Sequence, residues 1–150
     1  MKEVINTPIK IKLIRETSIM PRRGTPESAG LDLFADIENP IFIAKDTIVD
    51  IPVGVSMQIE PGYVGLIFVR SGMGCKHGVS APNSVGVIDS DYRGEMHIYL
   101  TCLKEEGYTV EPGDRVGQLV VIPVALSTPI EVEELADSVR GTHGFGSTGK

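Results

Sequence analysis

Apolar and polar residues alternate along most of this chain, and a two-residue period is typical of half-buried β-strands. Apolar residues from Ile9 to Leu13 alternate with lysines, and the same period returns over residues 53–59 and 64–68. The apolar positions of residues 85–88 predict another strand directly before Asp89. Shorter apolar segments predict further strands at Ile41–Ile43, Thr47–Ile51, Met96–Leu100, Tyr108–Val110, Leu119–Val124 and Ile130–Val132. The pattern therefore predicts an all-β protein.

Turn-forming dipeptides separate these segments. Pro61-Gly62 and Pro112-Gly113 place proline and glycine at the two central positions of a type II turn. About ten short strands separated in this way indicate a sandwich, a barrel or a jelly roll. Helix signals are few. We expect one or two turns at Ser71–His77, with Ser71 as the N-cap, and one more turn at Glu131–Ala136.

Size and charge narrow the class of protein. A chain of 150 residues, of which 41% are hydrophobic, fits one domain with a real core. The formal net charge of −6 argues against binding to DNA or RNA, which is dominated by a basic face. No apolar run approaches the ~20 residues that cross a bilayer, and the first residues lack the pattern of a signal peptide. We therefore expect a cytoplasmic protein without a membrane partner.

The C-terminal segment differs from the rest, because residues 140–150 hold four glycines and no periodicity. We expect a body over residues 1–139 and a flexible glycine-rich arm over residues 140–150. Phe145 has no strand or helix from which to reach its own core, so it either stacks on a flat ligand or inserts into a neighbouring subunit. The spacing Gly144-x4-Gly149-Lys150 resembles a phosphate-binding loop. The Ser/Thr and the helix that should follow the lysine are missing, so we reject that interpretation.

The window from Gly86 to Glu95 holds the clearest candidate chemistry. It places Asp89 and Asp91 beside Tyr92 directly after an apolar strand. A carboxylate at a rigid strand end beside an aromatic ring can activate water against a flat, ring-bearing substrate. Taken alone, such a window is more often a solvated turn.

Other polar groups are candidates for binding. Arg70-Ser71-Gly72 combines a guanidinium, a hydroxyl and the N–H groups of a helix start, which suit an anion. Arg140 is a second candidate for phosphate. Asp32 lies among apolar residues, where an unpaired carboxylate is costly. It could pair with an arginine or hold water on a metal ion. We favour a structural role for Asp32 over a direct catalytic one. The cysteines and histidines show no metal-ligand spacing, so we expect no protein-coordinated zinc.

Five segments in this order resemble the five motifs of the homotrimeric dUTPases (dUTP diphosphatases). They are Ala29–Asp36, Arg70–Gly78, Gly86–Glu95, Gly113–Val121 and Arg140–Gly149. The resemblance implies a jelly-roll β fold with at most one or two short helices, and a homotrimer with shared active sites. It also implies hydrolysis of dUTP to dUMP and pyrophosphate, which keeps uracil out of DNA and supplies dUMP for thymidylate synthesis. Mg²⁺ would be held by the triphosphate and water, with Asp32 as a candidate to assist, and not by direct protein ligands.

The resemblance also assigns roles to single residues. Asp89 matches the base that deprotonates the water attacking the α-phosphorus. Tyr92 matches the residue under the deoxyribose, where a ribose 2′-hydroxyl would collide. The groups that would read uracil are Asn83, Gly86, Val87, Ile88 and the main chain near His97. The groups that would bind the phosphates are Arg70, Ser71, Gly72, Gln118, Arg140, Ser147 and Thr148. Phe145 and Gly146 match the part of the arm that closes as a lid, with Phe145 stacked on uracil.

Four positions depart from the family pattern. Gly74 and Gly117 stand where alanine is expected, Cys102 stands where asparagine is usual, and Val69 replaces a frequent proline before Arg70. These differences concern packing more than the proposed chemical groups.

Two alternatives come from different classes. A dCTP deaminase shares the fold, but it places a catalytic glutamate where this chain has Tyr99. A non-catalytic or regulatory relative would be expected to have lost Asp89, Arg70 or Phe145, and this chain keeps all three.

Overall fold

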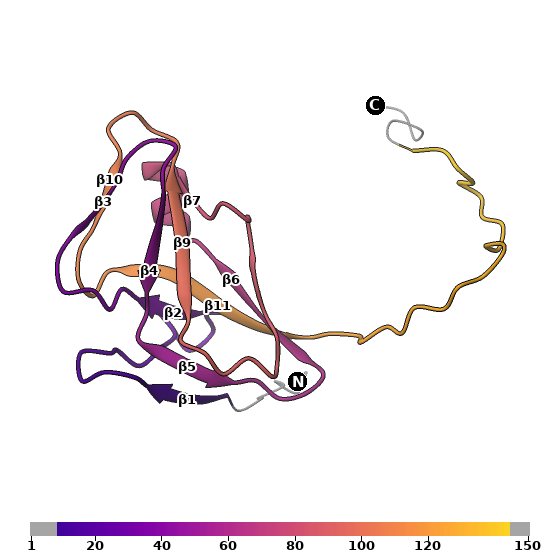
Figure 1. The fold of residues 1–150 in the computed structure, drawn as a ribbon, viewed down its shortest axis with the longest axis horizontal. Coiled ribbons are helices and arrows are strands. Elements are labelled where there is room, and N and C mark those ends of the chain that lie inside the picture. The colour runs from indigo at the N-terminus through magenta and orange to yellow at the C-terminus, as the bar shows by residue number, and fades with distance from the viewer. Residues whose placement is uncertain (1–8, 145–150) are drawn as a thin grey trace.

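The structure is a computed structural model that describes residues 9–144 (Figure 1). Within those residues, eleven β-strands and one short helix make up the regular structure. The strands are β1 (Lys10–Leu13), β2 (Leu31–Phe34), β3 (Ile41–Ile43), β4 (Ile48–Pro52), β5 (Val55–Gln58), β6 (Tyr63–Phe68), β7 (Val79–Ser80), β8 (Gly86–Ile88), β9 (His97–Cys102), β10 (Tyr108–Val110) and β11 (Arg115–Pro123), and the helix is η1 (Gly72–Lys76). The all-β prediction is confirmed.

All the strand pairs are antiparallel, and most join strands that are distant in sequence. A four-stranded sheet has the order β2-β11-β6-β8, and a three-stranded sheet has the order β4-β9-β7. Two further ladders join β1 to β5 and β3 to β10. The long β11 pairs with β2 on one edge and with β6 on the other. The chain thus crosses repeatedly between sheets, as a jelly roll requires.

The two-residue period of β9 shows how the sequence builds the core. Ile98, Leu100 and Cys102 point inwards and are buried, whereas His97 and Tyr99 alternate with them and are exposed. Each fully buried aliphatic side chain of this kind contributes about 1.5–3 kcal/mol. The residues that are completely buried include Leu33, Ile43, Ile51, Val55, Leu100 and Val116. The alternation that fills the core therefore also presents His97 and Tyr99 on the outer face.

The turns and the helix lie where the sequence predicts them, with one correction. Gly62 and Gly113 have φ of 85° and 79°, as the second central position of a type II turn requires. The helix forms at the expected place, but the prediction that Ser71 caps it is wrong. Ser71 has φ −55° and ψ −38° and makes no side-chain capping hydrogen bond. A capping residue needs a non-helical backbone, and Ser71 is already helical.

The chain leaves the body after β11. Every described residue from Ile122 to Gly144 is exposed, and Figure 1 shows the chain after β11 running far from the sheets. The predicted strand at Ile130–Val132 and the predicted helical turn at Glu131–Ala136 are both wrong. A short apolar segment needs a partner strand or a packing surface, and the described residues offer neither to residues 130–136. Over the part of the chain that the structure describes, no helix is long and apolar enough to cross a membrane.

Candidate active site

Two strand edges that lack ladder partners define the candidate site. Among the described strands, β8 pairs with β6 alone. β9 pairs with β4 along one edge, and its other edge meets β7 only at Thr101 and Cys102. One edge of β8 and the first residues of β9 therefore offer backbone N–H and C=O groups to a ligand.

Two adjoining hollows lie between these edges, and Ile88, His97 and Tyr99 line both of them. The first has a volume of about 300 Å³ and a mostly apolar lining that also includes Asn83 and Gly86. The second has a volume of about 330 Å³. It is also lined by Asp50, Val87, Asp89, Tyr92, Glu95 and Met96. We call the two together the hairpin pocket, because both lie where the chain turns back from β8 to β9, two strands that do not pair with each other.

The proposed base and the proposed sugar-screening ring lie together in this pocket. Asp89 follows β8 directly and is exposed. Its carbonyl accepts a hydrogen bond from the Tyr92 backbone N–H at 3.1 Å, which closes the turn. The Tyr92 hydroxyl donates to the backbone carbonyl of Glu95 at 2.9 Å. A Cβ on Gly94 would overlap with that hydroxyl, so glycine is needed there.

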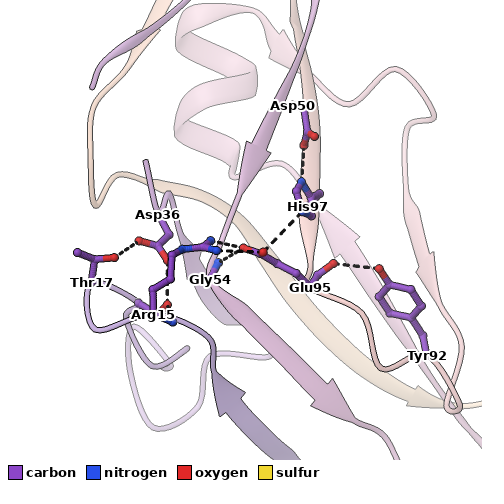
Figure 2. Close-up of polar contacts among 9 residues, drawn as sticks. Arg15, Thr17, Asp36, Asp50, Gly54, Tyr92, Glu95 and His97 are labelled. Atoms are coloured by element: carbon purple, nitrogen blue, oxygen red, sulfur yellow. Dashed lines mark hydrogen bonds and ion pairs between the residues drawn. The ribbon is translucent and has the colours of Figure 1, made fainter. Parts of the chain in front are cut away.

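A charged network under the pocket was not predicted from the sequence (Figure 2). The Glu95 carboxylate accepts hydrogen bonds from both terminal nitrogens of Arg15 and from the Gly54 backbone N–H. The Arg15 Nε donates to Asp36 at 2.9 Å. On the pocket side, His97 Nδ1 lies 2.8 Å from Asp50 Oδ1, and its Nε2 lies 3.9 Å from Glu95 Oε2.

The network changes the acidity of its members. The Arg15 hydrogen bond holds the pKa of Glu95 below its ordinary value, against the opposing effect of burial. Burial raises the pKa of Asp36, but hydrogen bonds from Thr17, Ser18 and Arg15 outweigh it, so the pKa is lowered. The hydrogen bond to Glu95 raises the pKa of Arg15. All three groups are therefore charged at neutral pH.

The described residues predicted to bind phosphate do not line the hairpin pocket, although Arg70 directly follows Val69, which does. Arg70 Nε lies 3.1 Å from Asp32 Oδ1, and Arg115 donates to Asp32 Oδ2 at 3.3 Å. Ser71 and Gly72 are exposed at the start of η1. Gln118 is half-buried, and its side chain is so close to Gly30 that a Cβ there would lie 2.9 Å from Oε1. None of these groups lines either hollow within the chain.

Of the arm, the structure describes Arg140 to Gly144, and none of these residues lines the hairpin pocket of its own chain. Arg140 is exposed, and its carbonyl accepts a hydrogen bond from the His143 N–H. The predicted residues Phe145, Gly146, Ser147 and Thr148 lie outside the described residues.

The departures from the family pattern are packing features. A Cβ on Gly117 would lie 2.7 Å from Ile98 Cδ1, a side chain that lines the first hollow. A Cβ on Gly74 would meet only the Val79 carbonyl, at 3.5 Å. Cys102 is fully buried, and its Sγ lies 3.6 Å from the His77 carbonyl.

Two observations bear on how a metal ion could be held. Over residues 9–144, no three Asp, Glu, His or Cys side chains gather into a cluster that could hold an ion. Both oxygens of Asp32 already face arginines, so this carboxylate fits contact through water better than direct ligation.

Solved structures share this fold. A dUTPase of Staphylococcus bacteriophage 80alpha with dUpNHpp aligns with a TM-score of 0.83 and 26% identity, over 97% of this chain and 100% of that one. A mutant dUTPase from phage phi11 of S. aureus aligns with a TM-score of 0.77 and 24% identity, over 85% of this chain and 98% of that one. The structure of that phage protein shows the coordination of a structural Mg(II) ion. The class is therefore the dUTPase-like all-β jelly roll.

Relatives at higher identity place the chain more narrowly. The family model named dUTPase matches residues 16–149. A deoxyuridine 5′-triphosphate nucleotidohydrolase of Fusobacterium nucleatum is 39% identical over 143 residues, which is 95% of this chain and 98% of the relative. One of Legionella pneumophila (strain Paris) is 42% identical over 151 residues, which is 100% of this chain and 99% of the relative. The chain belongs to the dUTPase family.

Proposed function

We propose that this chain is a dUTP diphosphatase that hydrolyses dUTP to dUMP and pyrophosphate. The observation that carries the proposal is the hairpin pocket, where a carboxylate, a tyrosine ring and two free strand edges surround one space. The family and its nucleotidohydrolase relatives support the same reaction. In a cell, the reaction removes dUTP before it enters DNA and supplies dUMP for thymidylate synthesis.

The pocket suits a deoxyuridine. The free backbone groups of β8 and β9, with Asn83, provide fixed donors and acceptors for the edge of a flat base. Cytosine would present the opposite donor and acceptor at its 4-position, which leaves a buried polar group unpaired. Tyr92 would lie under the sugar, where a ribose 2′-hydroxyl has no room.

The chemistry needs one proton acceptor. Asp89 accepts a proton from a water molecule as that water attacks the α-phosphorus. A new P–O bond forms, the bond from the α-phosphorus to the bridging oxygen breaks, and pyrophosphate leaves. Asp89 lies directly at the end of β8, so a rigid strand positions its carboxylate.

The phosphates would be bound by Arg70, Ser71, Gly72 and Gln118, and by Arg140 with Ser147 and Thr148 from the arm. Mg²⁺ would enter on the triphosphate and neutralise part of its charge. Asp32 would contact the ion through water, because Arg70 and Arg115 hold its carboxylate in place.

A complete site would be assembled from several copies of the chain. Arg70, Ser71 and Gln118 do not line the hairpin pocket of their own chain. The segment between β11 and the arm carries apolar side chains that are exposed within the chain, among them Leu126 (79%), Ile130 (81%) and Leu135 (87%). Such exposure is typical of a surface that another subunit covers. We therefore infer a homotrimer with shared active sites, in which Phe145 and Gly146 close over the nucleotide.

The test is pyrophosphate release from dUTP, dCTP, dTTP and UTP, with and without Mg²⁺. We expect Mg²⁺-dependent turnover of dUTP, with dCTP, dTTP and UTP as poor substrates. Asp89→Asn should keep nucleotide binding and lose at least the ~10²–10⁴-fold rate that a general base contributes. Asp91→Asn is the matched control, because Asp91 is an exposed acid two positions away that does not line the pocket.

Two results would contradict the assignment. If Asp89→Asn and Asp91→Asn lost the same activity, Asp89 would have no special role. Equal turnover of dUTP and UTP would remove the role given to Tyr92.

A further inference from the structure

We propose that Glu95, anchored by Arg15, is a positioning residue that sets where Tyr92 lies and so controls how strictly the pocket rejects a ribose. The inference rests on the proposed function, because it names a residue that tunes the sugar selectivity of that site. The Glu95 carbonyl contacts Tyr92, and the Glu95 carboxylate is held by Arg15. Glu95 itself does not react with the substrate.

The first step of the argument is the contact that holds Tyr92. Tyr92 as a whole residue is 44% exposed, so packing alone does not fix its ring. Its hydroxyl donates to the Glu95 carbonyl at 2.9 Å, three residues along the chain. Gly94 leaves the space that the hydroxyl occupies. The position of the ring therefore follows the position of the backbone at Glu95.

The second step is what holds that backbone. Glu95 lies between β8 and β9 and belongs to neither strand. Its carboxylate instead accepts from Arg15 Nη1 at 3.1 Å, from Arg15 Nη2, and from the Gly54 N–H at 3.2 Å. A bidentate guanidinium–carboxylate pair fixes orientation as well as distance. The Met96 N–H of the same peptide unit also donates to the Val55 carbonyl at 2.8 Å, so the carboxylate adds a second restraint, from the side-chain direction, to the Glu95 backbone.

The third step is that the anchor itself is rigid. Arg15 Nε donates to Asp36, whose side chain is only 6% exposed. Asp36 also accepts from Thr17 at 2.7 Å and from Ser18 at 2.8 Å. An isolated surface ion pair would restrain little, but this one is the outer end of a hydrogen-bonded network that reaches into the body. Figure 2 shows the series of hydrogen bonds that runs from Asp36 through Arg15 and Glu95 to Tyr92.

The test is the ratio of kcat/KM for dUTP to kcat/KM for UTP. We expect Glu95→Ala to lower this ratio about three- to tenfold, which is the range for the loss of one net hydrogen bond. Arg15→Lys should lower it in the same direction, because an ammonium cannot bridge Asp36 and Glu95 as the guanidinium does. A change that only reduced the folded fraction would lower both kcat/KM values equally and leave the ratio unchanged.

A double-variant cycle shows whether the effect passes through the tyrosine. Tyr92→Phe removes the hydroxyl and should lower the ratio by itself. If Glu95 acts through that hydroxyl, adding Glu95→Ala to Tyr92→Phe should change the ratio less than about twofold. Independent, multiplicative effects would overturn the proposal. A change in the ratio of dUTP to dCTP instead would mean that Glu95 acts on the base through His97, and would also overturn it.

The control is Glu105→Ala, which breaks the exposed ion pair with Lys45 and should leave both ratios unchanged.

Amide hydrogen exchange provides a readout without nucleotide. Glu95→Ala should speed exchange of the Tyr92 N–H but not of the β9 amides. If the wild-type chain releases no pyrophosphate from dUTP, the proposed function fails, and hydrogen exchange still decides whether Glu95 holds the turn. Unchanged exchange at Tyr92 would overturn the positioning role by itself.

Discussion

Replacing Gly54 with alanine tests whether the network around Asp36 needs a backbone position that only glycine can supply. Gly54 has φ of 66°, and a Cβ there would overlap with both Asp36 Oδ2 and Ser18 Oγ. Gly62 is the matched control, because its φ is 85° and a Cβ on it would meet nothing within 4 Å. Both variants place an alanine at a positive φ and so share that conformational cost. Only in Gly54→Ala does the new Cβ overlap with Asp36 and Ser18.

The expected magnitudes follow from these contacts. A left-handed backbone costs an alanine about 1–2 kcal/mol, and the stiffer unfolded chain offsets about 0.4–1 kcal/mol of it. Gly62→Ala should therefore lose about 1 kcal/mol. Gly54→Ala must also displace the Asp36 carboxylate from its hydrogen bonds to Thr17, Ser18 and Arg15. A bond to a charged group contributes about 1.5–3 kcal/mol, so the loss of one of these three bonds, added to the backbone cost, gives a total of about 2.5–4 kcal/mol.

Urea unfolding at one protomer concentration measures the difference, since assembly makes stability depend on concentration. With a slope of about 2 kcal/mol per molar urea, the Gly54→Ala midpoint should lie about 1 M or more below that of Gly62→Ala. Equal midpoints would refute the argument, because the collision with Asp36 would then carry no cost.

Two further predictions concern pH and the arm. The pKa values of Asp36 and Glu95 are lowered from 3.8 and 4.5 by folding, so the stability they contribute is present above about pH 4.5 and is lost as the pH falls through the folded values. Acid unfolding of Asp36→Asn should show a weaker pH dependence than the wild type, and an unchanged dependence would mean that this carboxylate is not linked to folding. Removing residues 140–150 should leave a folded trimer by size-exclusion chromatography and strongly reduce pyrophosphate release. Loss of the trimer would instead make this segment structural.

The sequence predicts those parts of the fold that depend on local pattern. The alternation at residues 53–59 and 64–68 corresponds to β5 and β6, and the Pro-Gly dipeptides correspond to turns with positive φ. The same rule fails at Ile130–Val132, because an apolar segment forms a strand only where a partner edge is available. It also misses the two-residue β7, which is too short to show a period.

Some residues of the candidate site could be predicted from the sequence, and others could not. Asp89, Tyr92 and the residues that precede them are close in sequence, so one motif locates them. Arg15 and Glu95 are 80 positions apart, and neither belongs to a pattern that would pair them. Only the fold, which brings the residues after β1 against the turn before β9, places them together.

The two free strand edges of the hairpin pocket have a consequence for the protein without its ligand. Unpaired edges invite edge-to-edge association with other chains, and β8, with only three residues, gives such association little length to build on. A bound nucleotide would occupy these edges as an extra strand does. Its binding would raise the free energy of unfolding in proportion to the logarithm of the nucleotide concentration. Nucleotide supply would then govern the solubility and lifetime of the protein as well as its rate of turnover.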